Sequence, residues 1–145
     1  MSLVYVEQVE YLDVEEIQET HEEEIKILNE LERLATQYFM DKSMLDELEL
    51  KINEYLDHVK LHFLNEEKLM RKYDFPSYDM HKIAHDTFLM DIGITISQWR
   101  KFGDVNKVIN FILKSPEWIV LHINTVDVPT SAYIARKMKQ DKESQ

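Results

Sequence analysis

Seven side chains of the metal-binding types histidine, glutamate and aspartate occur at spacings that four helices could bring together. They are His21, His62, Glu66, His81, His85, His122 and Asp127. The chain has 6 histidines, and all but His58 belong to this set. Imidazole and carboxylate ligands together suit iron, zinc or manganese. Because these ligands are more than one ion can use, the set predicts a site for two metal ions.

Two pairs in this set have the spacing of adjacent helical turns. Glu66 follows His62 at i+4, and His85 follows His81 at i+4. Residues at this spacing lie on one face of a helix, so each pair would project toward a common point.

The third pair, His122 and Asp127, has an i+5 spacing, which turns the two side chains away from each other in a regular α-helix. Either the site reaches across the edge of this helix, or the backbone loosens locally into a π-bulge, as helices do at some functional sites. The sequence leaves both alternatives open.

Apolar residues recur at steps of three and four along most of the chain, which is the pattern of amphipathic helices. The predicted helices cover residues 14–38, 45–73, 81–102 and 105–126. Glu66 and Asp127 fall on the apolar faces of these helices. A buried carboxylate is costly without a compensating charge, so both positions favour bound cations.

Capping residues and prolines predict where the helices begin and end. Asp13 with Glu16 resembles a capping box, Asp41 to Ser43 supplies a new start, and Gly103 is a C-terminal cap. Ser115-Pro116 predicts a break in the fourth helix. Pro129 predicts its end, followed by a tail helix from residue 130 to about 139.

The predicted fold class is all-α, an antiparallel up-down-up-down four-helix bundle with an N-terminal arm and a short tail helix. Residues 1–12 form the arm, about 13–127 the metal-binding bundle and 128–145 the tail, in a single domain over 1–145. In this topology residues early in the first and third helices lie level with residues late in the second and fourth. All seven ligands therefore converge on one layer.

Composition excludes several classes of protein. The 145 residues carry a net charge of −11 without a basic stripe, which argues against nucleic acid and anionic membrane as partners. The absence of cysteine excludes disulfides, thiolate zinc sites and iron–sulfur clusters. No signal peptide or membrane-spanning stretch is recognisable, so we expect a cytoplasmic location.

The order and context of the ligands resemble the hemerythrin family, and in particular its bacterial single-domain members. The resemblance covers roughly residues 13–127. It rests on His21 with Asn29, His62-Phe63-x-x-Glu66-Glu67-x-Leu69-Met70, His81-Lys82-x-x-His85-x-x-Phe88, and Trp118-x-x-x-His122-Ile123-x-x-x-Asp127.

This resemblance implies a non-haem centre of two iron ions that binds O₂ reversibly, as an oxygen carrier, store or sensor and not as an enzyme. It also implies the division of the ligands. His81, His85 and His122 would hold one iron, His21 and His62 would hold the other, and Glu66 and Asp127 would bridge them together with an oxo or hydroxo group.

Ligand counting leaves one coordination position open. Two octahedral ions offer about twelve positions, and the seven side chains with one bridging oxygen would fill about eleven. The predicted pocket around the vacancy consists of apolar side chains within a turn of the ligands. They are Phe63, Trp118, Ile119, Ile25 and Ile123.

Several positions depart from the usual family pattern, among them Gln18-Glu19-Thr20 in place of Asp-x-Gln before His21. Glu24 stands where a leucine is usual, and His58 stands where an aromatic residue is common. His58 lies one turn before His62, so it could be a packing residue, a proton donor or an alternative ligand.

Other functions remain open at this stage. The chain could be a di-iron oxidase, a peroxidase, a nitric-oxide-handling enzyme, or a module for iron storage or sensing. Oxygen-activating ferritin-like sites use Glu-x-x-His pairs, and this sequence has none. The excess of neutral imidazoles over carboxylates also favours reversible binding.

Overall fold

The structure, a computed structural model, describes Leu12 and residues 14–144 of the chain. This part is helical, with no strand. Its elements are α1 (Glu15–Met40), the 3₁₀ helix η2 (Lys42–Met44), α2 (Leu45–Lys72), α3 (Tyr78–Phe102), α4 (Asn106–His122), the π-helix η3 (Ile123–Asp127) and α5 (Val128–Glu143).

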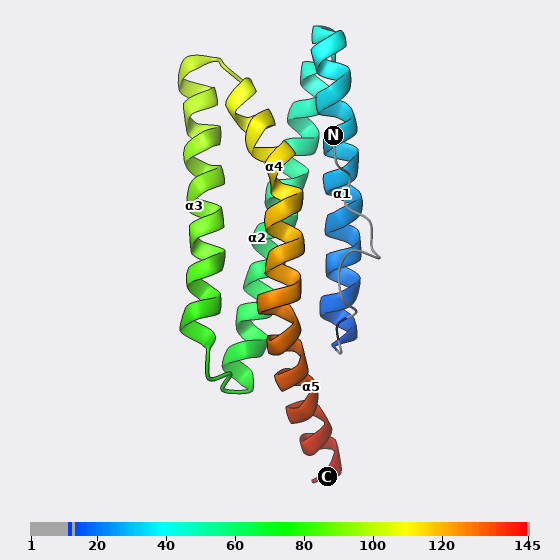
Figure 1. The fold of residues 1–145 in the computed structure, drawn as a ribbon, viewed down its shortest axis with the longest axis vertical. Helices are drawn as coiled ribbons and strands as arrows, with labels where there is room; N and C mark the ends of the chain where they lie inside the picture. The colour runs from blue at the N-terminus through cyan, green and yellow to red at the C-terminus, as the bar shows by residue number, and fades with distance from the viewer. Residues whose placement is uncertain (1–11, 13, 145) are drawn as a thin grey trace.

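Helices α1 to α4 form a bundle in which each helix runs opposite to the one before it (Figure 1). Helix α1 contacts α2 and α4, and α3 also contacts α2 and α4, so the four helices enclose a common interior. Helix α5 continues the direction of α4 and extends beyond the end of the bundle (Figure 1). The predicted all-α four-helix bundle is confirmed.

The predicted helix ends are found at two of the turns. Asp41 follows α1, and its carboxylate accepts a hydrogen bond of 3.0 Å from the backbone N–H of Ser43. Gly103 ends α3 with a φ of 74°, and its N–H donates to the carbonyl of Trp99 at 2.7 Å. Glycine reaches this left-handed conformation without steric cost, so it stops the helix cleanly.

The break predicted at Ser115-Pro116 is wrong, because α4 runs through Pro116. Proline removes one backbone hydrogen bond and crowds the preceding turn. The first turns of α4 are inclined to the rest of the helix in Figure 1, as expected for a bend at proline. The hydroxyl of Ser115 donates to the carbonyl of Phe111 at 3.0 Å, which supplies a hydrogen bond in the same region.

The helix end predicted before Pro129 is also wrong. Helix α4 passes through η3 directly into α5, and Pro129 occupies the first turn of α5. Pro129 directly follows the π-helical turn η3, where the backbone is looser than in a regular α-helix, so a proline is better tolerated there. The tail helix is therefore longer than predicted and begins at Val128.

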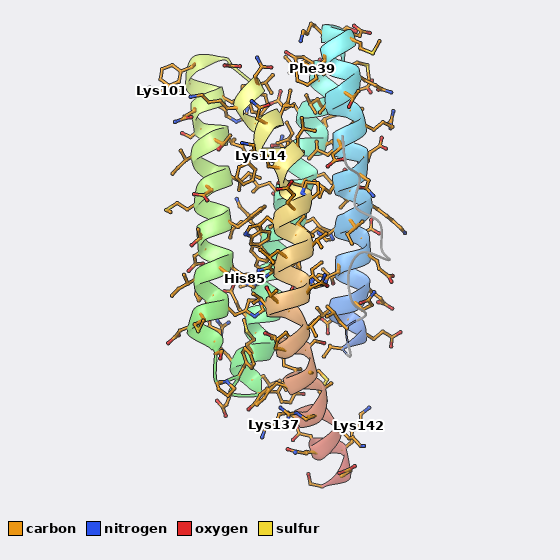
Figure 2. All side chains as sticks on the ribbon, in the orientation of Figure 1. Phe39, His85, Lys101, Lys114, Lys137 and Lys142 are labelled. Atoms are coloured by element: carbon orange, nitrogen blue, oxygen red, sulfur yellow. The ribbon has the colours of Figure 1, made fainter. Side chains whose placement is uncertain are left out.

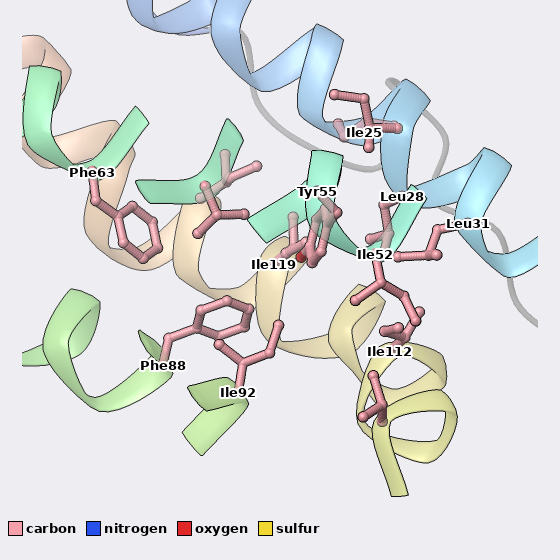
Figure 3. Packing of buried hydrophobic residues seen from close by; sticks show 14 of the residues in the cluster. Ile25, Leu28, Leu31, Ile52, Tyr55, Phe63, Phe88, Ile92, Ile112 and Ile119 are labelled. Atoms are coloured by element: carbon pink, nitrogen blue, oxygen red, sulfur yellow. The ribbon is translucent and has the colours of Figure 1, made fainter. Parts of the chain in front are cut away.

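Apolar side chains from α1 to α4 pack in a core that runs along the bundle axis (Figure 3). Leu31 and Ile112 lie toward one end of this cluster, and Phe63 and Phe88 lie toward the other (Figure 3). Burial of each large aliphatic side chain contributes about 1.5–3 kcal/mol, so this core holds the four helices in register around the polar residues.

The rest of the predicted arm and the predicted cap at Asp13 lie outside the described residues. Leu12 itself is buried, and its N–H donates to the side-chain oxygen of Gln18 at 2.9 Å. Within Leu12 and residues 14–144, no helix combines the length and the apolar character needed to cross a membrane.

Candidate metal centre

The structure brings the seven predicted ligands together inside the bundle. They come from all four helices of the bundle and from η3, and each is at most 6% exposed. The side chain of His85, labelled in Figure 2, points from α3 toward the other helices. No other cluster of the described residues has so many buried imidazoles, since these are all the histidines of the chain except His58.

The potential ligand atoms form two groups, within each of which all atoms lie no more than 4.8 Å apart. One group contains three histidines and the other contains two. The first is Glu66, His81, His85, His122 and Asp127, and the second is His21, His62, Glu66 and Asp127. Glu66 and Asp127 belong to both groups, which is the arrangement of bridging carboxylates.

Glu66 directs its two oxygens to different groups. Its Oε1 lies 2.7 Å from Nε2 of His81 and 3.6 Å from Nε2 of His85. Its Oε2 lies 2.8 Å from Nε2 of His62. The carboxylate therefore spans the space between the three-histidine group and the two-histidine group.

Asp127 is oriented in the same way. Its Oδ1 lies 3.0 Å from Nε2 of His81 and 3.1 Å from Nε2 of His122, while its Oδ2 lies 3.1 Å from Nε2 of His21. Of the two alternatives for the i+5 spacing of His122 and Asp127, the π-helical one is confirmed by η3.

Several atoms at the centre of this cluster are buried and have no hydrogen-bond partner among the described residues. They are Nε2 of His81, His85 and His122, Oε1 of Glu66 and both carboxylate oxygens of Asp127. Buried polar atoms without partners cost free energy. Their short mutual distances without hydrogen-bond geometry fit atoms that surround cations, and imidazole with carboxylate is a donor set for iron, zinc or manganese.

The outward-facing nitrogens of three of the histidines have partners. The hydroxyl of Thr130 donates to the carbonyl of Val126, so it accepts the hydrogen bond of 2.8 Å from Nδ1 of His81. Nδ1 of His85 donates to Glu67 at 3.0 Å, and Nδ1 of His62 contacts Glu24. A proton on each Nδ1 leaves the lone pair of Nε2 directed into the cluster, as a metal ligand requires.

Sequence reasoning did not identify these partners. Glu24 stands out in the sequence only as a departure from the family pattern, and Glu67 only as part of a matching run. Neither their roles nor that of Thr130 follow from the sequence, because each contacts a histidine of another helix. His58 belongs to neither ligand group, and its Nδ1 lies 3.7 Å from Oε2 of Glu24. His58 therefore lies outside the two ligand groups, next to Glu24, which contacts His62.

Electrostatics within the cluster favour opposite charges on the two residue types. Burial would raise the pKa of Glu66, but the neighbouring imidazoles hold it well below its usual value. Burial would lower the pKa of His62, but Glu24 and Glu66 raise it well above its usual value. The carboxylates of Asp127 and Glu66 likewise overcome the effect of burial on His81 and raise its pKa to about 9. The buried carboxylates are thus stabilised by nearby positive charge, which protons on the imidazoles or bound metal ions can supply.

A cavity of about 10 Å³ adjoins the two-histidine group. This is about the size that holds one water molecule. Its lining residues are His21, Glu24, His62, Phe63, Trp118, Ile119, His122, Ile123 and Asp127. Four of the five predicted pocket residues line it, whereas Ile25 is buried but is not among them.

Two aromatic rings stack on imidazoles of the three-histidine group. The ring of Phe63 stacks on that of His85 with centroids 3.8 Å apart and an interplanar angle of 4°. The ring of Trp118 stacks on that of His122 at 4.5 Å and 12°. Both aromatic residues also line the cavity, and their stacking limits the orientations of the two imidazoles.

Comparison with known proteins gives a consistent result. Residues 12–127 match the family model described as the hemerythrin HHE cation binding domain. The chain is 32% identical over 112 residues to the bacteriohemerythrin of Aquifex aeolicus (strain VF5), an alignment that covers 77% of this chain and 82% of that protein.

Two relatives from other organisms align over a shorter region. Hemerythrin subunit 1 of Golfingia vulgaris and hemerythrin of Phascolopsis gouldii are each 36% identical over 66 residues, which is 46% of this chain and 46% of each relative. No solved structure matches the chain significantly.

Proposed function

The chain belongs to the hemerythrin family, and on that premise we propose that it holds two iron ions and binds O₂ reversibly. The ligands would be divided as in the two groups of side chains. His81, His85 and His122 would hold one ion and His21 and His62 the other, while Glu66 and Asp127, which belong to both groups, would be shared between the ions.

The observation that carries this proposal is the position of the small cavity. His21 and His62, the group with fewer imidazoles, both line it. An ion with fewer protein ligands keeps a position open for an exogenous ligand. Ferrous iron supplies the electrons that reversible O₂ binding requires.

The side chains around the cavity restrict what can reach that position. Phe63, Ile119 and Ile123 are buried and apolar, so they admit a small apolar molecule and disfavour water and ions. Slow access of water and protons protects a bound gas from irreversible chemistry. Glu24, the one charged lining residue outside the ligand set, contacts Nδ1 of His62 and thereby orients that imidazole.

The proposed role is binding and not catalysis. The cluster has five imidazoles and two carboxylates, and neutral ligands stabilise a lower iron charge than a carboxylate-rich set does. The alternatives are a di-iron oxidase or peroxidase, a nitric-oxide-handling enzyme, and an iron storage or sensing module.

An O₂ titration after anaerobic loading with ferrous iron separates these functions. We expect a colour change that develops on oxygenation, disappears when O₂ is removed, and repeats over several cycles. The metal-free protein is the control. A centre that oxidises once without recovery, or that consumes O₂ continuously with an added reductant, would instead support the storage module or the enzyme.

A further inference from the structure

Helix α3 has a second apolar face, opposite the one that carries His81 and His85. The exposed fractions of Met80, Ile83, Met90 and Ile94 are 76%, 63%, 59% and 51%. Large exposed apolar patches on a soluble protein mark interaction sites. In Figure 1, α3 and α1 lie on opposite sides of the view, with α2 and α4 between them.

The exposed residues of this face follow the spacing of a helix-pairing seam. The outer seam of α3 is Met80, Ile83, Thr87, Met90, Ile94 and Ser97. Steps of three and four alternate without interruption along it, which is the heptad pattern of residues that pack between two helices. All six side chains are exposed.

A glycine beside this seam gives a second indication. Gly93 lies inside α3 and costs the helix about 0.5–1 kcal/mol relative to alanine. A Cβ atom added there would meet no atom within 4 Å among the described residues, so packing within this part of the chain does not require the glycine. Close approach of another helix from outside would require a residue without a side chain at this position.

We propose that the outer seam of α3 is an interface on which a second copy of this chain packs, with the two α3 helices antiparallel. This inference is independent of the proposed function, because none of the seam residues is a candidate ligand. The opposite orientations of the two copies follow from the pattern of apolar and charged residues along α3.

One register pairs all seam positions. Antiparallel heptads pair each a position with a d position of the other helix. Ile83 then packs on the second copy's Ile94, Thr87 on its Met90, and Met80 on its Ser97, each pair occurring twice through the two-fold axis. The two contacts between Ile83 and Ile94 thus lie on either side of the smaller contacts between Thr87 and Met90 at the centre.

The same register places compatible charges beside the seam. Asp79 lies opposite the second copy's Arg100. Arg100 is 3.0 Å from Glu49 of its own chain, and both side chains of that pair are partly exposed, so the pair is weak and can be shared. The two central aspartates face small uncharged residues, since Asp86 lies opposite Gly93 and Asp91 opposite Ala84.

Parallel pairing of the same face would place like charges together. Asp86 would then lie against the second copy's Asp91 on both sides of the seam, and adjacent like charges cost free energy. Helix α3 carries three acidic residues, balanced by Lys82, Arg100 and Lys101, in a chain whose net charge is −11. Two copies therefore meet over a locally neutral surface.

Sedimentation equilibrium of the full chain over a range of concentrations tests the association. We expect a mass of twice the 17.4 kDa of one chain at high concentration. The dissociation constant of Ile94→Glu should be at least tenfold higher, which corresponds to about 1.4 kcal/mol, because the new carboxylate would be buried without a partner against Ile83 of the second copy. Met40→Glu, at the end of α1 and 88% exposed, is the matched control. A monomer at all concentrations, or equal effects of the two variants, would overturn the proposal.

Cross-linking tests the orientation independently of the strength of association. The chain has no cysteine, so introduced thiols are unique. Mixing the Ile83→Cys and Ile94→Cys variants under mild oxidation should give a disulfide-linked dimer faster than either variant alone. Dimers that form at least as fast in the separate samples as in the mixture would indicate parallel pairing and overturn the antiparallel arrangement.

Discussion

The Oδ1 of Asp127 lies 3.1 Å from Nε2 of His122, although the two residues are at i and i+5. In an α-helix this offset would turn the side chains about 140° apart. The π-helical turn η3 takes up the extra residue and returns Asp127 to the face of His122. The same turn leads into α5, where Thr130 accepts the hydrogen bond from His81. A local loosening of the helix thus positions both a bridging carboxylate and the partner of a ligand.

Replacing Asp127 with alanine should lower the iron content from two ions per chain to one or none. Both ligand groups contain Asp127, so its loss removes a ligand from each ion. Elemental analysis of protein loaded with ferrous iron is the measurement. Asp57→Ala, which changes an exposed aspartate on α2, should keep two ions. Two ions in both variants would show that Asp127 is not a bridge.

Much of this arrangement follows from sequence periodicity, and the remainder depends on contacts between helices. The i,i+4 pairs of α2 and α3 fix which face each helix turns inward, so the bundle and the convergence of the ligands could be predicted. Pro116 and Pro129 do not interrupt the helices as the sequence predicts, because tertiary packing tolerates a bent helix and because a π-turn can place a proline in a first helical turn. Glu67 could not be assigned, since its partner His85 lies on another helix.

Removal of the metal should lower the thermal midpoint of unfolding. Metal ions that bind only the folded chain at 100 times their dissociation constant add about 2.7 kcal/mol of stability. For a chain of 145 residues this corresponds to roughly 5–10 °C. Calorimetry of the iron-loaded and the chelator-treated protein measures the two midpoints. The Asp127→Ala variant should show a smaller difference between its loaded and stripped midpoints. Equal midpoints for the loaded and stripped proteins would be inconsistent with a buried site that folding completes.

Replacing Glu67 with glutamine should weaken metal binding about 10–100-fold while leaving the fold intact. The carboxylate holds the Nδ1 proton of His85 and makes that imidazole a stronger ligand. Glu24→Gln should act in the same direction through His62. Competition with a coloured chelator measures the affinity.

Glu23→Gln is the matched control for both carboxylates, because Glu23 neighbours Glu24 in sequence but is exposed. It should leave the affinity unchanged. If Glu23→Gln weakened binding as much as Glu67→Gln, the effect would come from overall charge and not from orientation of the imidazole.

Replacing Ile119 with alanine should speed the oxidation of the loaded centre in air. Ile119 is 3% exposed and lines the small cavity, so the shorter side chain enlarges the space beside His21 and His62. A larger cavity admits water and protons more readily. The decay of the oxygenated absorbance measures the rate. Leu121→Ala, two residues further on α4 and 63% exposed, should leave the rate unchanged, and an equal rate in all three proteins would rule out a protective role of Ile119.

Glu32 should make the protein less stable as pH rises through the neutral range. Its side chain is fully buried, and neither carboxylate oxygen has a hydrogen-bond partner among the described residues. Burial raises its pKa from the ordinary 4.5 to about 7. Between these two values the folded chain binds more protons than the unfolded chain, so the free energy of unfolding falls as pH increases.

The size of this loss is at most about 3.5 kcal/mol, because each unit of pKa shift corresponds to about 1.4 kcal/mol. Glu32→Gln cannot ionise, so its stability relative to the unsubstituted protein should increase from pH 5 to pH 8. Urea denaturation at a series of pH values measures the difference, in which the titration of all other groups cancels. Glu19→Gln, an exposed change on the same helix, should give a difference that does not vary with pH. A Glu32→Gln difference that is equally flat would mean that this carboxyl ionises as freely in the folded chain as in the unfolded one.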